Sequence, residues 1–596
     1  MPSIMATVFT VAGWLSICHG TPLQGPKQIL ESYDFVIVGA GSAGSVLANR
    51  LSRDGKYTVL VLEAGDEMTD ELYIPFMAPF SANQNNSWGY KTDPQRSALF
   101  DFPGKMAAIT QGKVLGGTSS LNSMNYVRGN PHDFDMWETE FKATGWSYRD
   151  VLDYFKEIEN FMVPDVTKEE FTAYHGDKGE TPVTYPNYKT PVCDAFLKAC
   201  EESHYKKIDY NGANHSGYSR VQSNTLNGIR MGASTCFLDP IRNLTNLHIW
   251  TRSTATQILF NGKEATGVKF IKEGKEYIAK FRHEVIVSAG AIGSPKLLML
   301  SGIGRKKDLE NRNIKVVADL PVGQGLQDHV VFLGVVITTK EDLIGLRKMK
   351  EMGALYQYNH TGLLSIPGGF EALLFTHSGV NKTLEDYPDV ELELASVFPN
   401  KDIEHSPFVP PDVYQEYYSK MIDKNGFMAA IAMVQPESRG AVYLNTADPQ
   451  GNPHINPNML DMKTQDLFRI VNGTLKVMEL FKTSAMKAIE AKVWDEPYPR
   501  CSQFEMWSLE YVSCFVKHTA FPGQHVCCTC AMGDHFRAVV DKNLKVKKGV
   551  RKVRVADSSV MPKIVAGNTN AAVMMIAAKA AHMILADAAE NSAKGF

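Results

Sequence analysis

The feature that most constrains the fold is a glycine-rich turn near the start of the chain, set between two apolar runs. Residues 33–38 (YDFVIV) have the pattern of a buried strand, and Gly39-Ala40-Gly41-Ser42-Ala43-Gly44 follows directly. Residues 45–52 repeat apolar side chains at helical spacing, and residues 57–62 form a second strand pattern that ends at Glu63. This order predicts a βαβ unit around a G-x-G-x-x-G turn, the dinucleotide-binding fingerprint.

Each glycine of the turn has a separate physical role. Gly39 permits the tight turn, Gly41 lets the backbone approach a pyrophosphate, and Gly44 lets the helix pack closely on the strand. The N–H groups at the start of the helix then face the phosphates. We therefore expect Ala40, Ser42 and Ala43 to bind the cofactor together with the three glycines.

Glu63 and the adjacent Ala64 extend the expected cofactor site at the end of the second strand. A carboxylate at this position can accept hydrogen bonds from ribose hydroxyls. It also repels a ribose 2′-phosphate, which argues against NADP. The motif alone leaves FAD and NAD open.

Composition places the chain among large globular proteins. It has 596 residues, 44% of them hydrophobic and 21% charged, so a large packed core is feasible. The net charge of -3 argues against a general attraction to nucleic acid. Length alone predicts about four domains.

The N-terminus predicts export from the cell. Residues 5–18 are apolar and uncharged, and small residues follow, so we expect residues 1–20 to be a cleaved signal peptide rather than an anchor or a buried segment. The chain also carries six N-x-S/T sequons, typical of a secreted glycoprotein. They begin at Asn85, Asn214, Asn243, Asn359, Asn381 and Asn472.

Cysteine content and hydropathy give two further expectations. Eight cysteines remain after removal of Cys18, which allows at most four disulfides without defining a pairing. No other stretch is expected to span a membrane. The apolar run at residues 571–589 contains Lys579, His582 and Asp587, which favours a buried amphipathic helix.

Two further glycine-rich signatures follow. Residues 112–122 (GKVLGGTSSLN) form a loop of small side chains, suited to the close approach of a flat ring. Residues 285–304 (VIVSAGAIGSPKLLMLSGIG) predict a buried strand, a turn and a helix. Pro295 suits the first helical turn, and Gly302 is expected to end the helix.

These segments, in this order, resemble the glucose–methanol–choline (GMC) oxidoreductase family. The resemblance continues through residues 553–562 (VRVADSSVMP) and 567–570 (GNTN), and so spans roughly residues 33–585. Residues 88–95 (WGYKTDPQ) and 126–131 (YVRGNP) are similar to the insect-type members, among which are glucose dehydrogenases and leaf-beetle salicyl alcohol oxidases.

The family resemblance implies a fold with two interleaved domains rather than four. One is an α/β, Rossmann-like FAD-binding domain, and the other is an α+β substrate domain built on an antiparallel sheet. We expect residues 33–330 to be mainly FAD-binding and residues 331–520 mainly substrate-binding. Residues 521–590 would return to the FAD domain.

The resemblance also implies FAD rather than NAD, and it extends the set of cofactor residues. Some members link the flavin to a histidine of the first signature, but the matching position here is Leu121, so we expect non-covalent FAD. By family position the further cofactor-binding residues would be Val114, Gly117, Asn122, Ala255, Asp557 and Asn570.

Alcohol oxidation by a flavin needs a base for the hydroxyl proton and a donor for the developing alkoxide. The family pattern assigns the base to His525 and the donor to Asn568, against the alternatives of a structural histidine and a turn residue. The sequence departs from relatives beside the histidine. Val526, Cys528 and Ala531 stand where relatives usually carry Pro, Gly and Lys, which puts full activity in doubt.

The cluster Cys527, Cys528 and Cys530 lacks a second Cys/His pair at zinc spacing, so we expect thiols and no metal site. The resulting hypothesis is a secreted FAD enzyme that oxidises a primary alcohol, most simply an aromatic or terpenoid one, and passes electrons to oxygen or another acceptor. The alternatives are a sugar dehydrogenase with a non-oxygen acceptor and a weakly active, flavin-binding paralogue. The oligomeric state is left open.

Overall fold

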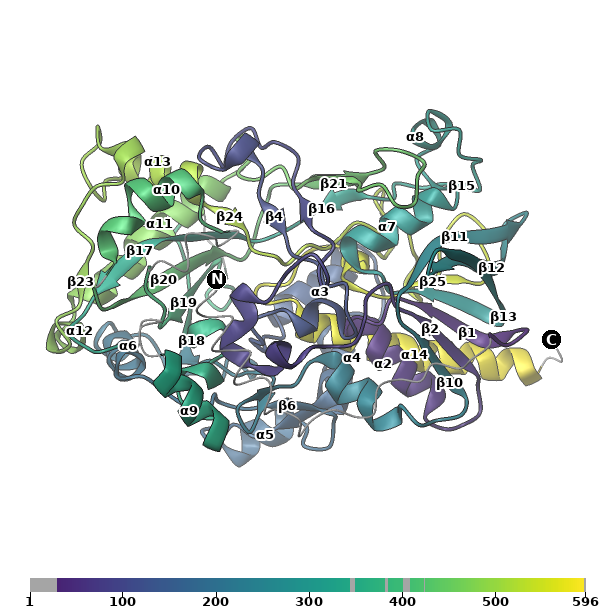
Figure 1. Ribbon diagram of the computed structural model, residues 1–596, viewed down its shortest axis with the longest axis horizontal. Helices are drawn as coiled ribbons and strands as arrows, with labels where there is room; N and C mark the ends of the chain where they lie inside the picture. Colours follow the sequence, from purple (N-terminus) through teal and green to yellow (C-terminus); the bar gives the residue numbers. More distant parts are fainter. Residues whose placement is uncertain (1–28, 344–348, 381–383, 400–407, 423, 594–596) are drawn as a thin grey trace.

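A computed structural model describes residues 29–343, 349–380, 384–399, 408–422 and 424–593. The predicted signal peptide and the sequon at Asn381 lie outside these residues. Two large sheets lie toward opposite ends of the molecule (Figure 1), with helices around each of them. The arrangement confirms the predicted α/β unit with an interleaved, sheet-based unit.

The first sheet is parallel at its centre. Its strands follow the order β10-β2-β1-β13-β12-β11, and β25 pairs with β13. The predicted strand at residues 33–38 is β1, buried at every position, as expected for a parallel strand covered on both faces. The other strands are β2 (Val59–Leu62), β10 (Leu247–Trp250), β11 (Ser253–Asn261), β12 (Glu264–Lys272), β13 (Lys275–Val287) and β25 (Val553–Val555).

The long strand β13 joins two kinds of pairing within this sheet. Its end, residues 285–287, runs parallel to both β1 and β25. Its beginning pairs antiparallel with β12, which in turn pairs antiparallel with β11. Because β25 comes from the C-terminal part of the chain, the nucleotide-binding sheet is complete only after almost the whole sequence has been used.

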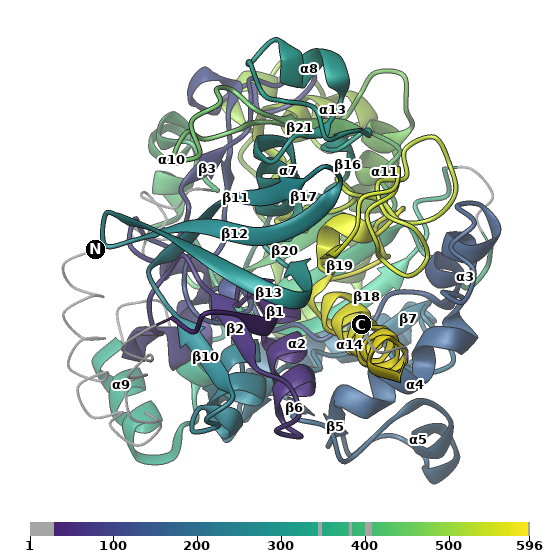
Figure 2. The same ribbon diagram turned by 90° about the vertical axis from the view of Figure 1, so that its right-hand side faces the viewer.

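Helix α2 (Ser42–Ser52) packs on the parallel strands β1 and β2, and two further helices continue the layer beyond it. α2 begins inside the glycine motif, and α14 (Asn570–Ala593) packs against both α2 and α4 (Tyr148–Ile158), as Figure 2 shows. By length and composition α14 could cross a membrane, the one such helix in the described part of the chain. Its most apolar window is 72% buried in the molecule, in line with the expected buried helix.

The second sheet is antiparallel throughout. Its order is β23-β17-β20-β19-β18-β7, and β24 also pairs with β17. Strand β7 comes from a part of the sequence that otherwise belongs with the first sheet, so the two units interleave. The strands are β7 (Gly217–Arg220), β17 (Val330–Thr338), β18 (Phe370–Thr376), β19 (Val390–Ala395), β20 (Gly426–Met433), β23 (Lys492–Val493) and β24 (Phe521–Pro522).

Helices cover one face of this second sheet and leave the other to a cavity. α11 (Asp466–Met478) packs on β20, and α13 (Leu509–Thr519) packs on β17. Alternate residues of β19, namely Val390, Leu392 and Leu394, belong to the core that these helices complete. Since strand side chains alternate in direction, the intervening residues point to the opposite face.

The position of Pro295 differs from the prediction. Helix α7 (Gly290–Leu300) begins five residues before it, so Pro295 lies inside the helix rather than in the first turn. A proline there has no N–H for the carbonyl of Ala291. The hydroxyl of Thr529 donates to that carbonyl instead, at 2.7 Å, which explains how the helix passes through the proline.

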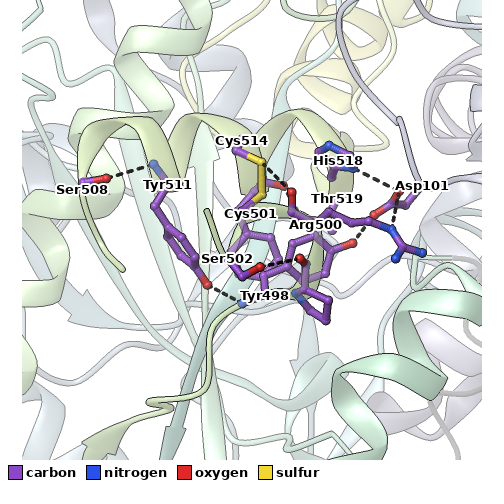
Figure 3. The surroundings of a disulfide bond; sticks show 12 residues. Asp101, Tyr498, Arg500, Cys501, Ser502, Ser508, Tyr511, Cys514, His518 and Thr519 are labelled. Atoms are coloured by element: carbon purple, nitrogen blue, oxygen red, sulfur yellow. Dashed lines mark hydrogen bonds and ion pairs between the residues drawn. A yellow bond between two sulfur atoms is a disulfide. The ribbon is translucent and has the colours of Figure 1, made fainter. Parts of the chain in front are cut away.

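One disulfide, of the four that the cysteine count allowed, is present in the described part. It joins Cys501 and Cys514 and ties the loop before α13 to that helix (Figure 3). Nearby, His518 Nδ1 lies 3.0 Å from Asp101 Oδ1. Six further cysteines are free and buried: Cys193, Cys200, Cys236, Cys527, Cys528 and Cys530.

Candidate active site

A cavity of about 640 Å³ lies between the two sheets. One wall comes from the glycine-rich turns of the first unit, and the opposite wall comes from the free face of the second sheet. His525, Asn568 and Gln524 line the same cavity, so both predicted catalytic residues meet the predicted cofactor residues.

The glycine wall is built from close backbone contacts. Gly39 has a positive φ of +97°, and a Cβ at this residue would lie 2.5 Å from the oxygen of Ser288. A Cβ at Gly44 would lie 1.8 Å from the oxygen of Gly39. A Cβ at Gly117 would lie 2.7 Å from the Cα of Gly41, so the first and second signatures touch through bare backbone. These contacts require glycine and leave the turn open toward the cavity.

Most of the predicted cofactor residues line this cavity together. They are Gly39, Gly41, Ser42, Ala43, Glu63, Ala64, Gly117, Asn122, Ala255, Asp557 and Asn570. Three others lie behind the lining. Gly44 packs against Gly39, Ala40 is completely buried, and Val114 belongs to a small apolar cluster. The amide of Ala40 donates to Glu63, so its role is to hold that carboxylate.

Two buried carboxyl groups organise the turns of this wall. Glu63 accepts from the amides of Ala40 and Gly65, each at 2.8 Å, and burial raises its pKa to about 7. Asp557 accepts from the amide of Gly290 at 2.9 Å and from Ser294, and burial raises its pKa as well. Both therefore hold glycine turns in place as well as facing the cavity.

The N-termini of α2 and α14 meet at the cavity. Ser42, the first residue of α2, donates to the side chain of Asn570, the first residue of α14, at 2.6 Å. The free N–H groups of a helix start favour an anion such as a pyrophosphate. The signature turns, the open backbone at Gly41 and this helix start fit FAD.

His525 is held by an antiparallel contact between two loops. Its amide donates to Asp328 at 2.7 Å, and the amides of Gly523 and Cys527 donate to the carbonyls of His329 and Gln327. Burial raises the pKa of Asp328 to about 7. These backbone hydrogen bonds, at His525 and on both sides of it, fix the backbone of the histidine without involving its ring.

The neighbouring rings define which nitrogen of His525 carries a proton. His329 Nε2 lies 3.1 Å from the carbonyl of Val565, which only accepts, so His329 is protonated there. Burial, and then the nearby His525, hold the pKa of His329 well below its usual range, so it is neutral and its Nδ1 accepts. His525 Nδ1 lies 3.0 Å from that atom and must therefore donate.

His525 consequently has a free lone pair on Nε2. Burial lowers its pKa to about 4, so the neutral ring is present at physiological pH. The partner of Nε2 is Asn568 Nδ2 at 3.3 Å, while Asn568 Oδ1 is buried without a hydrogen-bond partner. His525 is the one histidine that lines the cavity among the described residues. The geometry suits proton abstraction from a bound hydroxyl.

Several site residues were missed by sequence reasoning. His329 directly follows Asp328 and carries no local motif, so only the fold reveals its contact with His525. Glu391 and Glu393 also line the cavity, and they lie in a strand without signature residues. An unusual pair of acidic residues in an apolar strand was the one available signal.

The side chain of Cys528 lies outside the lining of the cavity and so does not narrow it. The residue is buried and is absent from the lining, and its sulfur lies 2.6 Å from that of Cys527. Its φ of +75° is in the left-handed region that favours glycine, which explains why a glycine suits this position. No group of three or more His, Cys, Asp or Glu side chains in the described chain could hold a metal ion.

Comparison with known proteins agrees with this geometry. Two models described as GMC oxidoreductase match residues 33–331 and 436–577. Glucose dehydrogenase [FAD, quinone] of Drosophila melanogaster is 34% identical over 93% of this chain and 86% of its own length. Ecdysone oxidase of Spodoptera littoralis is 32% identical over 97% of this chain and 96% of its own.

Among solved structures, formate oxidase of Aspergillus oryzae has a TM-score of 0.81 at 26% identity, covering 94% of this chain and 99% of the other. Pyridoxine 4-oxidase from "Mesorbium loti" has a TM-score of 0.77 at 25% identity, with coverages of 92% and 98%. The signatures, the cavity and these matches together show that the chain belongs to the GMC oxidoreductases, FAD-dependent enzymes that oxidise CH–OH donors.

Proposed function

We propose that this enzyme oxidises an apolar primary alcohol, aromatic or terpenoid, to the aldehyde. The observation that carries the proposal is the unprotonated Nε2 of His525, which faces a largely apolar cavity. A neutral imidazole in that position can remove the hydroxyl proton as the carbinol hydrogen leaves. FAD, when bound, supplies the acceptor for that hydride at its N5 position.

Asn568 has a defined part in this proposal. One of its N–H groups is directed at His525 Nε2, and its side chain also hydrogen-bonds Glu393. A substrate oxygen that takes the place of Asn568 at Nε2 gives its proton to His525 and receives the freed N–H. The amide then stabilises the developing alkoxide, as expected for a donor aimed at the reacting oxygen.

The substrate class follows from the wall that faces the glycine turns. The rings of Phe370, Phe408 and Phe521 line it together with aliphatic residues of β17 and β20. A sugar needs a hydrogen-bond partner for most of its hydroxyls, and this wall has few to offer. An alcohol with a hydrocarbon body buries that body here, which favours binding.

The test is anaerobic bleaching of the flavin in the purified holoenzyme. We expect cinnamyl alcohol or geraniol to reduce the flavin, and glucose to do so poorly. Peroxide formed under air would identify an oxidase, whereas turnover only with a dye acceptor would identify a dehydrogenase. If none of the alcohols bleaches the flavin, the proposal is wrong and the flavin-binding paralogue gains support.

We also propose that the enzyme is a secreted glycoprotein. Four of the sequon asparagines, Asn85, Asn214, Asn243 and Asn359, are exposed and so accessible to glycan transfer. Asn472 is half-buried on α11. The Cys501–Cys514 disulfide is in keeping with an oxidising compartment. Recovery from culture medium with a mass that falls after glycosidase treatment would support this, and retention inside the cell without glycan would contradict it.

A further inference from the structure

Two acidic side chains stand on the cavity face of the second sheet. Glu391 and Glu393 are two residues apart on β19, so they point to the same side of the sheet. Their neighbours on β20 in register, Ala432 and Ala430, line the cavity too. On the other side of β19 the partners in register are the larger Phe375 and Leu373 of β18. Both glutamates line the cavity, although Glu391 is almost completely buried in its wall.

The two carboxyl groups differ in their partners. Glu393 accepts from the side chain of Asn125 at 3.0 Å and also interacts with Asn568. Glu391 is 1% exposed, and its Oε1 has no hydrogen-bond partner. Among the described residues, no lysine or arginine is among the groups that shift the pKa of either carboxyl group. A buried carboxyl oxygen without a partner is costly unless a ligand supplies one.

The state of Glu391 indicates which ligand fits. Burial, reinforced by the neighbouring Glu393, raises the pKa of Glu391 well above its usual value, so it is a neutral carboxyl group. Such a group both donates and accepts one hydrogen bond. A hydroxyl matches both functions, whereas an ammonium group has donors alone and would leave the carboxyl proton without an acceptor.

We propose that Glu391, held beside Glu393, is a subsite for a second hydroxyl group of the substrate, remote from the carbinol that reacts at His525. This inference rests on the proposed function and narrows its substrate class. The preferred substrates are hydrocarbon diols, or aromatic and terpenoid alcohols with a further hydroxyl. The apolar wall contacts the hydrocarbon between the two hydroxyls, and Glu391 binds the distal one.

The experiment compares matched substrates in the holoenzyme. Anaerobic flavin reduction is measured with 1-butanol, 1-hexanol and 1-octanol and with the corresponding α,ω-diols. For each alcohol the rate constant of flavin reduction is divided by the dissociation constant. We expect this quotient to be about tenfold to a hundredfold larger for one diol than for its mono-alcohol, because only the diol offers a hydroxyl to Glu391. The best chain length measures the distance between the two sites.

Variants locate the effect. Glu391→Leu should lower that diol to mono-alcohol ratio toward one, and Glu391→Gln, which still donates and accepts, should retain most of it. Glu479→Leu, an exposed glutamate at the end of α11, is the matched control and should leave the ratio as in the wild type. Flavin content and thermal unfolding report whether each variant is folded.

Several outcomes would overturn the subsite. A ratio near one for every chain length in the wild type does so without any variant, and so does a ratio that survives Glu391→Leu in a flavin-loaded enzyme. A gain for ω-amino alcohols instead of diols would show that the pair binds a cation. If cinnamyl alcohol and geraniol also fail to bleach the flavin, the proposed function fails first and the subsite falls with it, whereas bleaching by these two and by neither linear series overturns the subsite alone.

Discussion

The two walls of the cavity are built on different principles. The wall at Gly41 and Gly117 consists of backbone, and any side chain added at Gly117 collides with the opposite turn. The wall at Glu391, Glu393 and Ala430 consists of side chains on a sheet whose other face carries the core. The first wall cannot change without loss of its shape, whereas the second can exchange side chains while the sheet persists. The backbone wall therefore suits a cofactor that stays the same, and the side-chain wall suits a substrate that can vary.

The largest expected effect is on the glycine wall. Gly117→Val places a side chain against Gly41, where a Cβ alone would lie 2.7 Å from the Cα, and we expect the protein to lose FAD and with it all activity. Flavin content after purification measures this. Gly262→Val is the matched control, because Gly262 has a similar φ of +61° but open space around its Cβ. Full flavin content in Gly117→Val would contradict the backbone wall.

The second-largest expected effect concerns His525, which lines the cavity together with both walls. His525→Ala removes the proposed base, and we expect flavin reduction by an alcohol to slow by about 10²–10⁴-fold while flavin content stays at the wild-type level. Anaerobic stopped-flow absorbance gives the rate. His582→Ala, at an exposed histidine of α14, serves as control. An unchanged rate in His525→Ala would show that another group takes the proton.

The pH profile depends on the same residue. Burial lowers the pKa of His525 to about 4, and the base acts only when neutral, so the second-order rate of reduction should rise with pH to a plateau above about pH 5. A rate constant recorded from pH 3.5 to 8 checks the acid limb. A limb near the ordinary histidine value of about 6.5 would mean that the ring is hydrated in the working enzyme.

The smallest expected effect concerns Cys528, which lies three residues after His525 but outside both walls. Its left-handed φ favours glycine, so Cys528→Gly should be more stable than Cys528→Ala by about 1 kcal/mol in free energy of unfolding. Both variants lose the sulfur and differ by one methyl group, whose strain at this φ must outweigh the greater freedom of glycine in the unfolded chain. Denaturant unfolding measures the difference. Equal stability of the two variants would show that the backbone adapts at this residue.

The glycine wall was predictable because its requirements are local. Residues 33–38 predicted β1 to the residue, Gly39 and Gly41 occupy the predicted turn, and Gly44 lies in the first turn of α2, packed against Gly39. Helix α7 shows the limit of local rules. Pro295 suggested a helix start, but the hydroxyl of Thr529, more than two hundred residues away, allows the proline inside the helix.

The opposite wall, formed by the second sheet, could not be predicted in the same way. The environment of Glu391 and Glu393 is formed by the neighbouring strand β20 and by Asn125 and Asn568, which come from other parts of the chain. The carbonyl of Val565 sets the tautomer of His329, and the tautomer of His525 follows from that of His329. Such contacts join segments that are far apart in the sequence, so no motif or residue spacing reveals them.

The sequence by itself determined the cofactor-binding βαβ unit and the family, because turns with positive φ and close backbone contact demand glycine at set positions. It also pointed to His525 and Asn568 through the family resemblance. Only the tertiary structure decided the state of that pair and the character of the opposite wall. Burial sets the pKa of His525, and strand register brings Glu391 and Glu393 to one face. Burial and register depend on how distant strands pack, so they appear only once the chain is folded.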